Sequence, residues 1–253
     1  MKKLNTLIIL LAITVIAYGQ DYTLAHSTGK LIVEDVDEVT IEGYSGTEII
    51  FSGHRSEEIN ERAAGLKLIN SLGIDDNTGL GINVKEEGND VHVTGLGNSN
   101  DGRVTIKLPQ NMDVYYSHSD YNGGELLIQD VAGEIEVSAA YNEVHLINVT
   151  GPMAVKSIYG EIEAVFSTLS QEGSISLNSS YNLIDVTFPS SAGYNINMST
   201  PYGNIYSDVD VNIASGEDDM KRISAKKVKG TVNGGGVEIT IKSGYENIYL
   251  RKG

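Results

Sequence analysis

The feature that most constrains the fold is a short pattern centred on tyrosine, which recurs through the second half of the chain. It occurs as SAAYNEV, KSIYGEI, NSSYNLI, STPYGNI and KSGYENI. Apolar residues alternate with polar ones on both sides of the tyrosine, an arrangement that indicates two short strands joined by a turn. The tyrosines recur about every 20 residues, a period typical of stacked repeats. They are Tyr121, Tyr141, Tyr159, Tyr181, Tyr202 and Tyr245.

This period predicts an all-β fold, a single-stack β-solenoid similar to a parallel β-helix, with coils of about 20 residues. A single coil buries too few apolar side chains to offset the entropy cost of ordering its backbone, so the coils must stack on one another. The interval from Tyr202 to Tyr245 is about two coils long. We expect one of these two coils to be distorted by the charged segment 217–229.

The residue after each tyrosine predicts the geometry of the turn. Asn or Gly fills this position in every copy except the last, where it is Glu246. Both residue types tolerate a positive φ better than most, so we expect a left-handed backbone there. A second corner is predicted at the glycines eight residues before a tyrosine, such as Gly151 and Gly173. The turn residues after the tyrosines are Asn122, Asn142, Gly160, Asn182 and Gly203.

In stacked coils the tyrosines should form a column, with rings about 4.8 Å apart, the spacing of neighbouring strands. Two interpretations of this column are open. The rings could form a platform for the flat faces of sugars. Alternatively the column is structural, because a bulky amphipathic residue seals each corner and hydrogen-bonds through its hydroxyl group.

The beginning of the chain predicts export. Lys2 and Lys3 precede an apolar run, and the A-Y-G sequence at 17–19 is typical of a cleavage site, so we expect a signal peptide at residues 1–19. Residues 20–110 keep a strand pattern and should form further β-coils, with one short helix near residues 56–66 capped by Ser56. Residues 111–253 should form the tyrosine-centred repeats, continuous with the preceding part.

Charge and composition exclude several classes of function. The net charge of −16 disfavours nucleic acid and anionic membrane surfaces as partners. The chain contains no cysteine, which excludes disulfides, thiol catalysis and a lipid-modified cysteine. After cleavage of the signal peptide, no apolar stretch is long enough to span a membrane. We therefore expect an exported protein that is periplasmic, associated with the outer membrane or secreted.

The search for catalytic motifs yields one constellation. The five histidines are scattered without metal-binding spacing, and no G-x-S-x-G sequence is present, so no metal site, cofactor or nucleophile is predicted. The outward positions after the tyrosines, however, should bring four carboxylates together on one face. This acidic patch could be a solvated surface, a site for a divalent cation, or paired acids for cleavage of a polysaccharide. Its members are Glu143, Glu161, Glu163 and Asp185.

Several segments carry a family resemblance. The segments VTIEGYSGTEIIFSG, ERAAGLKLIN, NTGLGINVKEEGNDVHVTG and RVTIKLPQNMDV, followed by the repeats, resemble the putative-adhesin, or toastrack, family of bacterial β-strand-repeat proteins, a domain of unknown function. The resemblance implies a β-helix-like stack in an exported or envelope-attached protein. It implies adhesion, and in some relatives envelope-stress sensing, but it supplies no catalytic residues.

Three functions follow from these observations. The first is a non-enzymatic scaffold that binds a surface glycan or an envelope protein along its flat sides. The second is a polysaccharide lyase or hydrolase that uses the acidic patch. The third is envelope-stress sensing through a partner protein.

Overall fold

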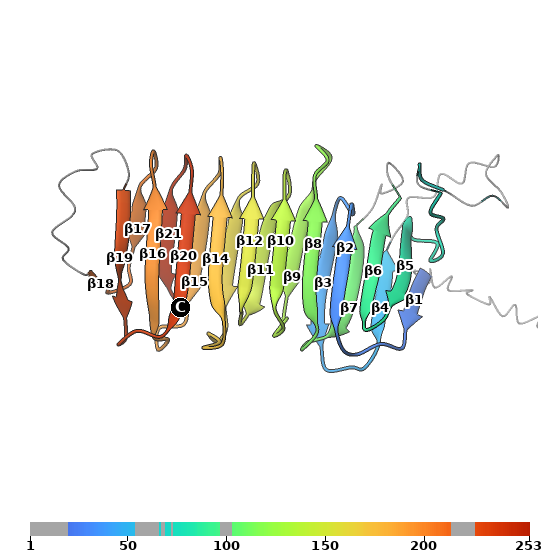
Figure 1. Ribbon diagram of the computed structural model, residues 1–253, viewed down its shortest axis with the longest axis horizontal. Coiled ribbons are helices and arrows are strands. Elements are labelled where there is room, and N and C mark those ends of the chain that lie inside the picture. Colours follow the sequence, from blue (N-terminus) through green and yellow to red (C-terminus); the bar gives the residue numbers. More distant parts are fainter. Residues whose placement is uncertain (1–19, 54–65, 67–68, 72, 97–102, 214–225) are drawn as a thin grey trace, which may run out of the picture.

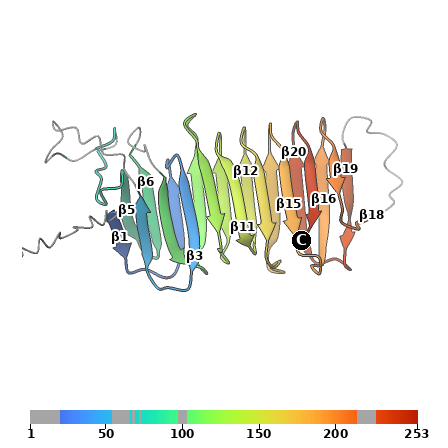
Figure 2. The same ribbon diagram turned by 180° about the vertical axis from the view of Figure 1, so that it is seen from behind.

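The computed structural model describes residues 20–53, 66, 69–71, 73–96, 103–213 and 226–253. Within these residues the protein is all-β, as predicted, and consists of two large sheets that face each other along an elongated body (Figures 1 and 2). We call the ten-stranded sheet sheet A and the eleven-stranded sheet sheet B.

The spatial order of the strands in both sheets runs along the body. From the end that holds β1, sheet A contains β1 (Gln20–Leu24), β4 (Ile49–Gly53), β7 (Val104–Pro109), β3 (Val39–Tyr44), β9 (Glu125–Gln129), β11 (Glu143–Val149), β13 (Ile162–Phe166), β15 (Ile184–Phe188), β21 (Ile248–Lys252) and β17 (Ile205–Ser207). From the opposite end, sheet B contains β18 (Asn212–Ile213), β19 (Lys226–Val232), β16 (Tyr194–Thr200), β20 (Val237–Ser243), β14 (Ser174–Ser179), β12 (Met153–Ser157), β10 (Ile135–Ala139), β8 (Asp113–His118), β2 (Lys30–Glu34), β6 (Asp90–Gly95) and β5 (Ile82–Glu87).

Successive strands of the central repeats alternate between the two sheets, so each coil contributes one strand to each. Strands of neighbouring coils pair in parallel and in matching register, as Val144 pairs with Ile162 and Ile162 with Ile184. Every second side chain of a strand points inward and is buried, because side chains alternate between the two faces of a strand. The result is a β-solenoid-like body whose apolar core is continuous between the sheets.

The order of the coils in space differs from their order in the sequence at both ends. Strands β2 and β3 lie between the coil of β6 and β7 and the coil of β8 and β9. Strands β20 and β21 lie between the coil of β14 and β15 and the coil of β16 and β17. In its described part, the interval between Tyr202 and Tyr245 therefore does not contain a distorted coil stacked in sequence order. Between β17 and β20 this part forms β18 and β19, and β19 runs antiparallel to β16.

Antiparallel strands also flank the stack at its other end, where β1 pairs with β4, β4 with β7, and β5 with β6. The helix predicted near residues 56–66 lies outside the described residues except for Leu66, which is not helical. The described residues contain no helix, and hence none long and apolar enough to cross a membrane. The predicted signal peptide, residues 1–19, also lies outside them.

The corner after each tyrosine differs from the prediction. Asn122, Asn142, Gly160, Asn182 and Gly203 are absent from the described residues with positive φ. Close approach of the neighbouring coil explains the glycines instead, because a Cβ atom on Gly160 would lie 1.7 Å from the carbonyl oxygen of Asn142. The second predicted corner uses a left-handed backbone in some coils, with φ of 83° at Gly151 and 79° at Gly173, but Gly133 at the same position has no positive φ.

Candidate functional site

The tyrosine rings form a stack along the edge where the chain passes from sheet B to sheet A. Neighbouring ring centroids are 4.8 to 5.0 Å apart and the ring planes are within 20° of parallel. Their order in space is Tyr141, Tyr159, Tyr181, Tyr245, Tyr202, which follows the inserted coil of β20 and β21. Tyr121 stands outside these ring contacts and is 77% exposed.

The stacking bears on the two interpretations of the tyrosine column. Inside the stack, each ring face is covered by the next ring, so a sugar cannot lie flat against it. The exposed parts of these side chains are therefore the ring edges and hydroxyl groups, and the three central rings are about half exposed. This geometry favours the structural interpretation.

A buried hydroxyl group below the corner holds the turn in place at four of the tyrosines, Tyr159, Tyr181, Tyr202 and Tyr245. Ser157 Oγ donates to the carbonyl oxygen of Gly160 at 2.8 Å, and Thr200 Oγ1 accepts from the backbone N–H of Gly203 at 3.0 Å. These hydroxyls lie two residues before the tyrosine, and this recurrence is a signal in the sequence that can identify the corner. The residues are Ser157, Ser179, Thr200 and Ser243.

The outer face of sheet A brings together most of the predicted acidic patch. His145, Glu163 and Asp185 lie side by side on β11, β13 and β15, because they are register partners. Glu143 lies on the same face at the start of β11, and Glu161 directly precedes β13. All four predicted carboxylates thus lie on neighbouring coils.

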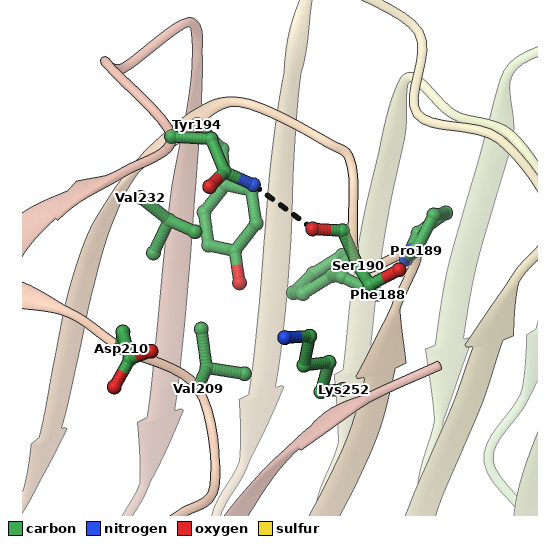
Figure 3. A pocket seen from close by; sticks show the side chains of 9 residues that line it. Phe188, Pro189, Ser190, Tyr194, Val209, Asp210, Val232 and Lys252 are labelled. Carbon is green, nitrogen blue, oxygen red and sulfur yellow. Dashed lines mark hydrogen bonds between the residues drawn. The ribbon is translucent and has the colours of Figure 1, made fainter.

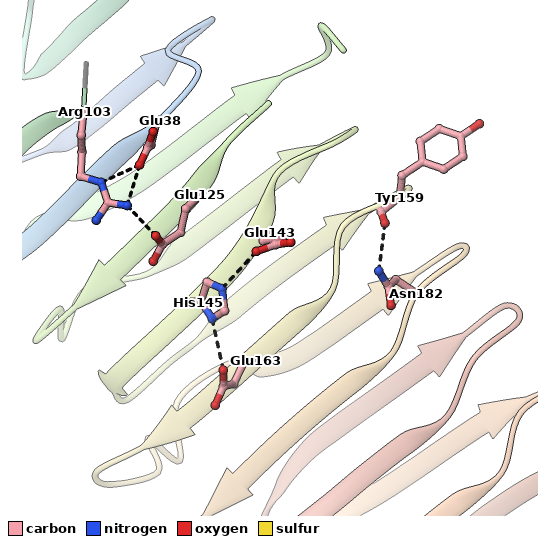
Figure 4. Close-up of polar contacts among 8 residues, drawn as sticks. All are labelled: Glu38, Arg103, Glu125, Glu143, His145, Tyr159, Glu163 and Asn182. Carbon is pink, nitrogen blue, oxygen red and sulfur yellow. Dashed lines mark hydrogen bonds and ion pairs between the residues drawn. The ribbon is translucent and has the colours of Figure 1, made fainter. Parts of the chain in front are cut away.

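Three of these carboxylates have basic partners. His145 lies between two of them, with Nδ1 3.2 Å from Glu163 and Nε2 4.0 Å from Glu143 (Figure 4). Arg251 donates two hydrogen bonds of 2.7 Å to the two carboxylate oxygens of Asp185. This contact raises the pKa of Arg251, chiefly through the hydrogen bonds to Asp185.

The same pairing continues along sheet A. Arg103 Nη2 lies 2.6 Å from Glu38 and 2.5 Å from Glu125, so one guanidinium group bridges two coils (Figure 4). The hydrogen bonds to Glu38 raise the pKa of Arg103. Lys107 pairs with Glu42 at 3.4 Å. Within the described residues, no group of three or more metal-ligating side chains converges on one point.

A small pocket lies at the C-terminal end of the stack (Figure 3). The buried ring of Tyr194 packs against Phe188 at 5.0 Å, and the pocket is closed by Val209, Val232 and Lys252. Burial raises the pKa of Tyr194 to about 12. The volume of about 50 Å³ admits a few water molecules but no sugar.

A buried polar cluster that the sequence did not predict lies inside the corner between β8 and β10. Tyr116 donates to the carbonyl oxygen of Val36 at 2.8 Å, and His118 Nε2 lies 2.9 Å from Asp37. Asn142 has no exposed surface, and its Nδ2 donates to the Tyr116 hydroxyl at 2.9 Å and to the Asp37 carbonyl oxygen at 2.8 Å. The cluster connects neighbouring coils, because its hydrogen bonds join Val36 and Asp37 to β8 and to the corner at Asn142.

Comparison with known proteins supports the fold. The structure is similar to the crystal structure of a "putative cell adhesion protein" from Clostridium sporogenes ATCC 15579, with a TM-score of 0.50. The two sequences are 14% identical, and the match covers 93% of this chain and 100% of the other. No family model and no curated protein matches the chain. At this identity the likeness shows a shared β-solenoid-like fold.

Proposed function

We propose that this protein is an exported, non-enzymatic binding scaffold of the adhesin type. In this proposal it is a single-stack β-solenoid in the periplasm, on the outer membrane or outside the cell. The fold that it shares with a protein described as a cell adhesion protein supports this assignment. So does the resemblance of its sequence segments to the toastrack family.

The observation that carries the proposal is that most of the predicted acidic side chains are ion-paired and that the faces of the tyrosine rings are covered. Three of the four predicted acids of sheet A are paired with His145 or Arg251, and the inner faces of the tyrosine stack are covered by neighbouring rings. Paired charges and covered rings are poor catalytic groups, because catalysis needs groups that can reach a substrate. The two long outer faces are then the surfaces on which binding takes place. A surface glycan or an extended segment of an envelope protein fits them.

Binding assays test this function directly. Purified protein is applied to arrays of bacterial and host-type glycans and to isolated envelope fractions, and retained material is quantified. Saturable binding to a glycan or to an envelope protein is the expected outcome. If no extended ligand binds, the scaffold function is wrong.

A carbohydrate-active enzyme is the second candidate. The adjacent positions of Glu163 and Asp185, with Arg251 beside them to neutralise an acidic substrate, favour it. The test is incubation with uronate-containing polysaccharides, followed by detection of unsaturated ends or new reducing ends. Activity that is lost in Glu163→Gln would support the enzyme. Activity that is unchanged in this variant would exclude the acidic patch as its site.

A further inference from the structure

The outer face of sheet B carries a row of six residues that the strand register places side by side. Ser138 pairs with Lys156, and Lys156 with Asn178. Asn178 pairs with Lys242, which pairs in turn with Ser199. Ser199 pairs with Lys227 of β19. We call Ser138, Lys156, Asn178, Lys242, Ser199 and Lys227 the lysine row.

The lysines of this row are exposed and have no carboxylate partner. Lys156 and Lys242 each lie between two buried residues on their strands and point to solvent, and Lys227 is exposed as well. Among the described residues, no ion pair involves any of the three. Lys30, Lys85 and Lys107 differ from the lysines of the row, because each contacts a glutamate.

The spacing of the charges is regular. Neighbouring strands are about 4.8 Å apart, so lysines on every second strand repeat at about 9.6 Å along the long axis. The positions between them hold Asn178 and Ser199, which are neutral and can hydrogen-bond. The Asn178 amide is oriented by donation from Nδ2 to Ser176 Oγ at 2.9 Å. Positive charge and neutral polar groups therefore alternate along the row.

The neighbouring positions leave the row accessible. The middle of the adjacent outward row contains the small residues Ala154, Ser176 and Thr240, which do not rise above the sheet. Glu136 precedes them in this row, and Asn197 and Lys229 follow them. Two acidic residues lie on this part of the face. Glu136 lies beside Ala154 and is ion-paired with Lys30 at 2.7 Å. Glu238 lies two outward positions from Lys242 and accepts a hydrogen bond of 2.7 Å from Asn195. A linear ligand can therefore contact successive lysines without crossing a bulky side chain.

We propose that the lysine row binds an acidic polysaccharide that carries one carboxylate in each disaccharide and lies along the long axis. In an extended β-linked glycan, one sugar spans nearly the same distance as one strand spacing, so alternate sugars face alternate strands. Each carboxylate then pairs with a lysine, and each neutral sugar hydrogen-bonds to Asn178 or Ser199. This inference rests on the proposed scaffold function and specifies its ligand.

The charge pattern disfavours two other polyanions. A glycan with a carboxylate on every sugar would place half of its charges opposite neutral side chains. Double-stranded DNA carries one charge per about 1.7 Å of its axis, which is far denser than the charges of the row. The spacing of the lysines, together with the sign of their charge, therefore determines which ligand binds.

The test compares two triple variants with the same change in net charge. The row variant is Lys156→Gln, Lys242→Gln and Lys227→Gln, and the control variant is Lys85→Gln, Lys107→Gln and Lys252→Gln. The probe is hyaluronate of defined length, which alternates a uronate and a neutral amino sugar, and affinity is measured by calorimetry at low salt. We expect the row variant to bind at least about tenfold more weakly than the wild type, and the control variant to stay within about twofold.

A register variant removes the effect of net charge entirely. The exchange Asn178→Lys with Lys242→Asn moves the middle lysine by one strand and keeps the overall charge. We expect it to weaken hyaluronate binding several-fold, because the charge period is broken. Equal binding by this variant and the wild type would overturn the proposal.

Further probes distinguish the remaining outcomes. Equal affinity for hyaluronate, polygalacturonate and duplex DNA would overturn the proposal, because it would show a general polyanion surface. Hyaluronate binding that both triple variants reduce equally would overturn the lysine row but leave the scaffold function intact. Failure to bind any glycan or envelope component would overturn both.

Discussion

The two outer faces of this protein are built on the same coils but present opposite chemistry. On sheet A, carboxylates and basic groups are paired, as in Asp185 with Arg251 and Glu163 with His145. On the C-terminal half of sheet B, Lys156 and Lys242 stand among neutral polar residues without carboxylate partners. Paired charges satisfy one another, whereas an unpaired row attracts a ligand of opposite charge. This comparison shows that the coil geometry fixes the distance between outward side chains, whereas the identity of those side chains determines what each face can bind.

The largest expected effect concerns the core that both faces share. Ile162 is fully buried on β13, so Ile162→Ala should lower the free energy of unfolding by about 2–5 kcal/mol. Val165 lies on the same strand and points outward, and Val165→Ala should cost less than about 1 kcal/mol. Urea denaturation followed by circular dichroism measures both values. Equal losses would contradict the assignment of inner and outer faces.

The next effect concerns the corner that joins the two sheets. Asn142→Ala removes the donor to the Tyr116 hydroxyl and to the Asp37 carbonyl oxygen, so the free energy of unfolding should fall by about 1–3 kcal/mol. Asn182 occupies the same position two coils further along but is partly exposed, and its side chain makes a single 3.2 Å hydrogen bond across the coils, to the carbonyl oxygen of Tyr159. Asn182→Ala serves as the matched variant in the same denaturation assay, and a loss as large as that of Asn142→Ala would argue against the buried cluster.

A smaller effect on stability should distinguish an ion-paired side chain on sheet A from an unpaired one on sheet B. Asp185→Asn leaves Arg251 without its carboxylate, and because the pair is partly exposed to solvent the melting temperature should fall by only about 1–2 °C. Lys242→Gln on sheet B should leave the stability unchanged, since no ion pair is broken. Thermal unfolding at low and high salt resolves the difference, which salt should reduce. A stability loss in Lys242→Gln that exceeds the loss in Asp185→Asn would contradict the distinction between paired charge on sheet A and unpaired charge on sheet B.

The smallest effect tests paired charge at the N-terminal end of sheet B. Burial opposes the charged form of His26, but its 3.0 Å contact with Glu86 and its backbone hydrogen bonds outweigh this, and the pKa of His26 is raised above 6.5. A raised folded-state pKa gives stability below the unfolded pKa, and this stability is lost as the pH rises through the folded pKa. Glu86→Gln should therefore destabilise the protein slightly more at about pH 5.5 than at about pH 8.5. Thermal unfolding across this range measures it, and a larger effect at the higher pH would contradict the prediction.

Much of the fold can be predicted from the sequence, because the signals for it are local. Alternation of apolar residues around each tyrosine indicates strands, and the period predicts stacked coils. The order of the coils cannot be predicted in this way. Strands such as β14, β16 and β20 share the same inward apolar pattern, so any of them can pair with any other at similar local energy. The packing of the whole chain determines which of these strands pair.

The candidate sites also contain some residues that the local sequence predicts and others that only the tertiary structure brings together. The acidic residues of sheet A are predictable because they recur at fixed positions after the tyrosine, and their coils follow one another in sequence. Most of their basic partners are not predictable, because Arg251 and Arg103 come from coils far away in the chain. The positive φ predicted for Asn142 is wrong, and its buried contacts with Tyr116 and Asp37 are tertiary.

The sequence by itself therefore determined the repeat, the tyrosine edge and the inward apolar layer, because these follow from the periodicity of side chains along a strand. Only the tertiary structure decided which coils are neighbours. The insertion of β20 between β14 and β16 places Lys242 midway between Lys156 and Lys227. Without this insertion Lys242 would not lie in the lysine row, because outward side chains align only when backbone hydrogen bonds hold their strands side by side.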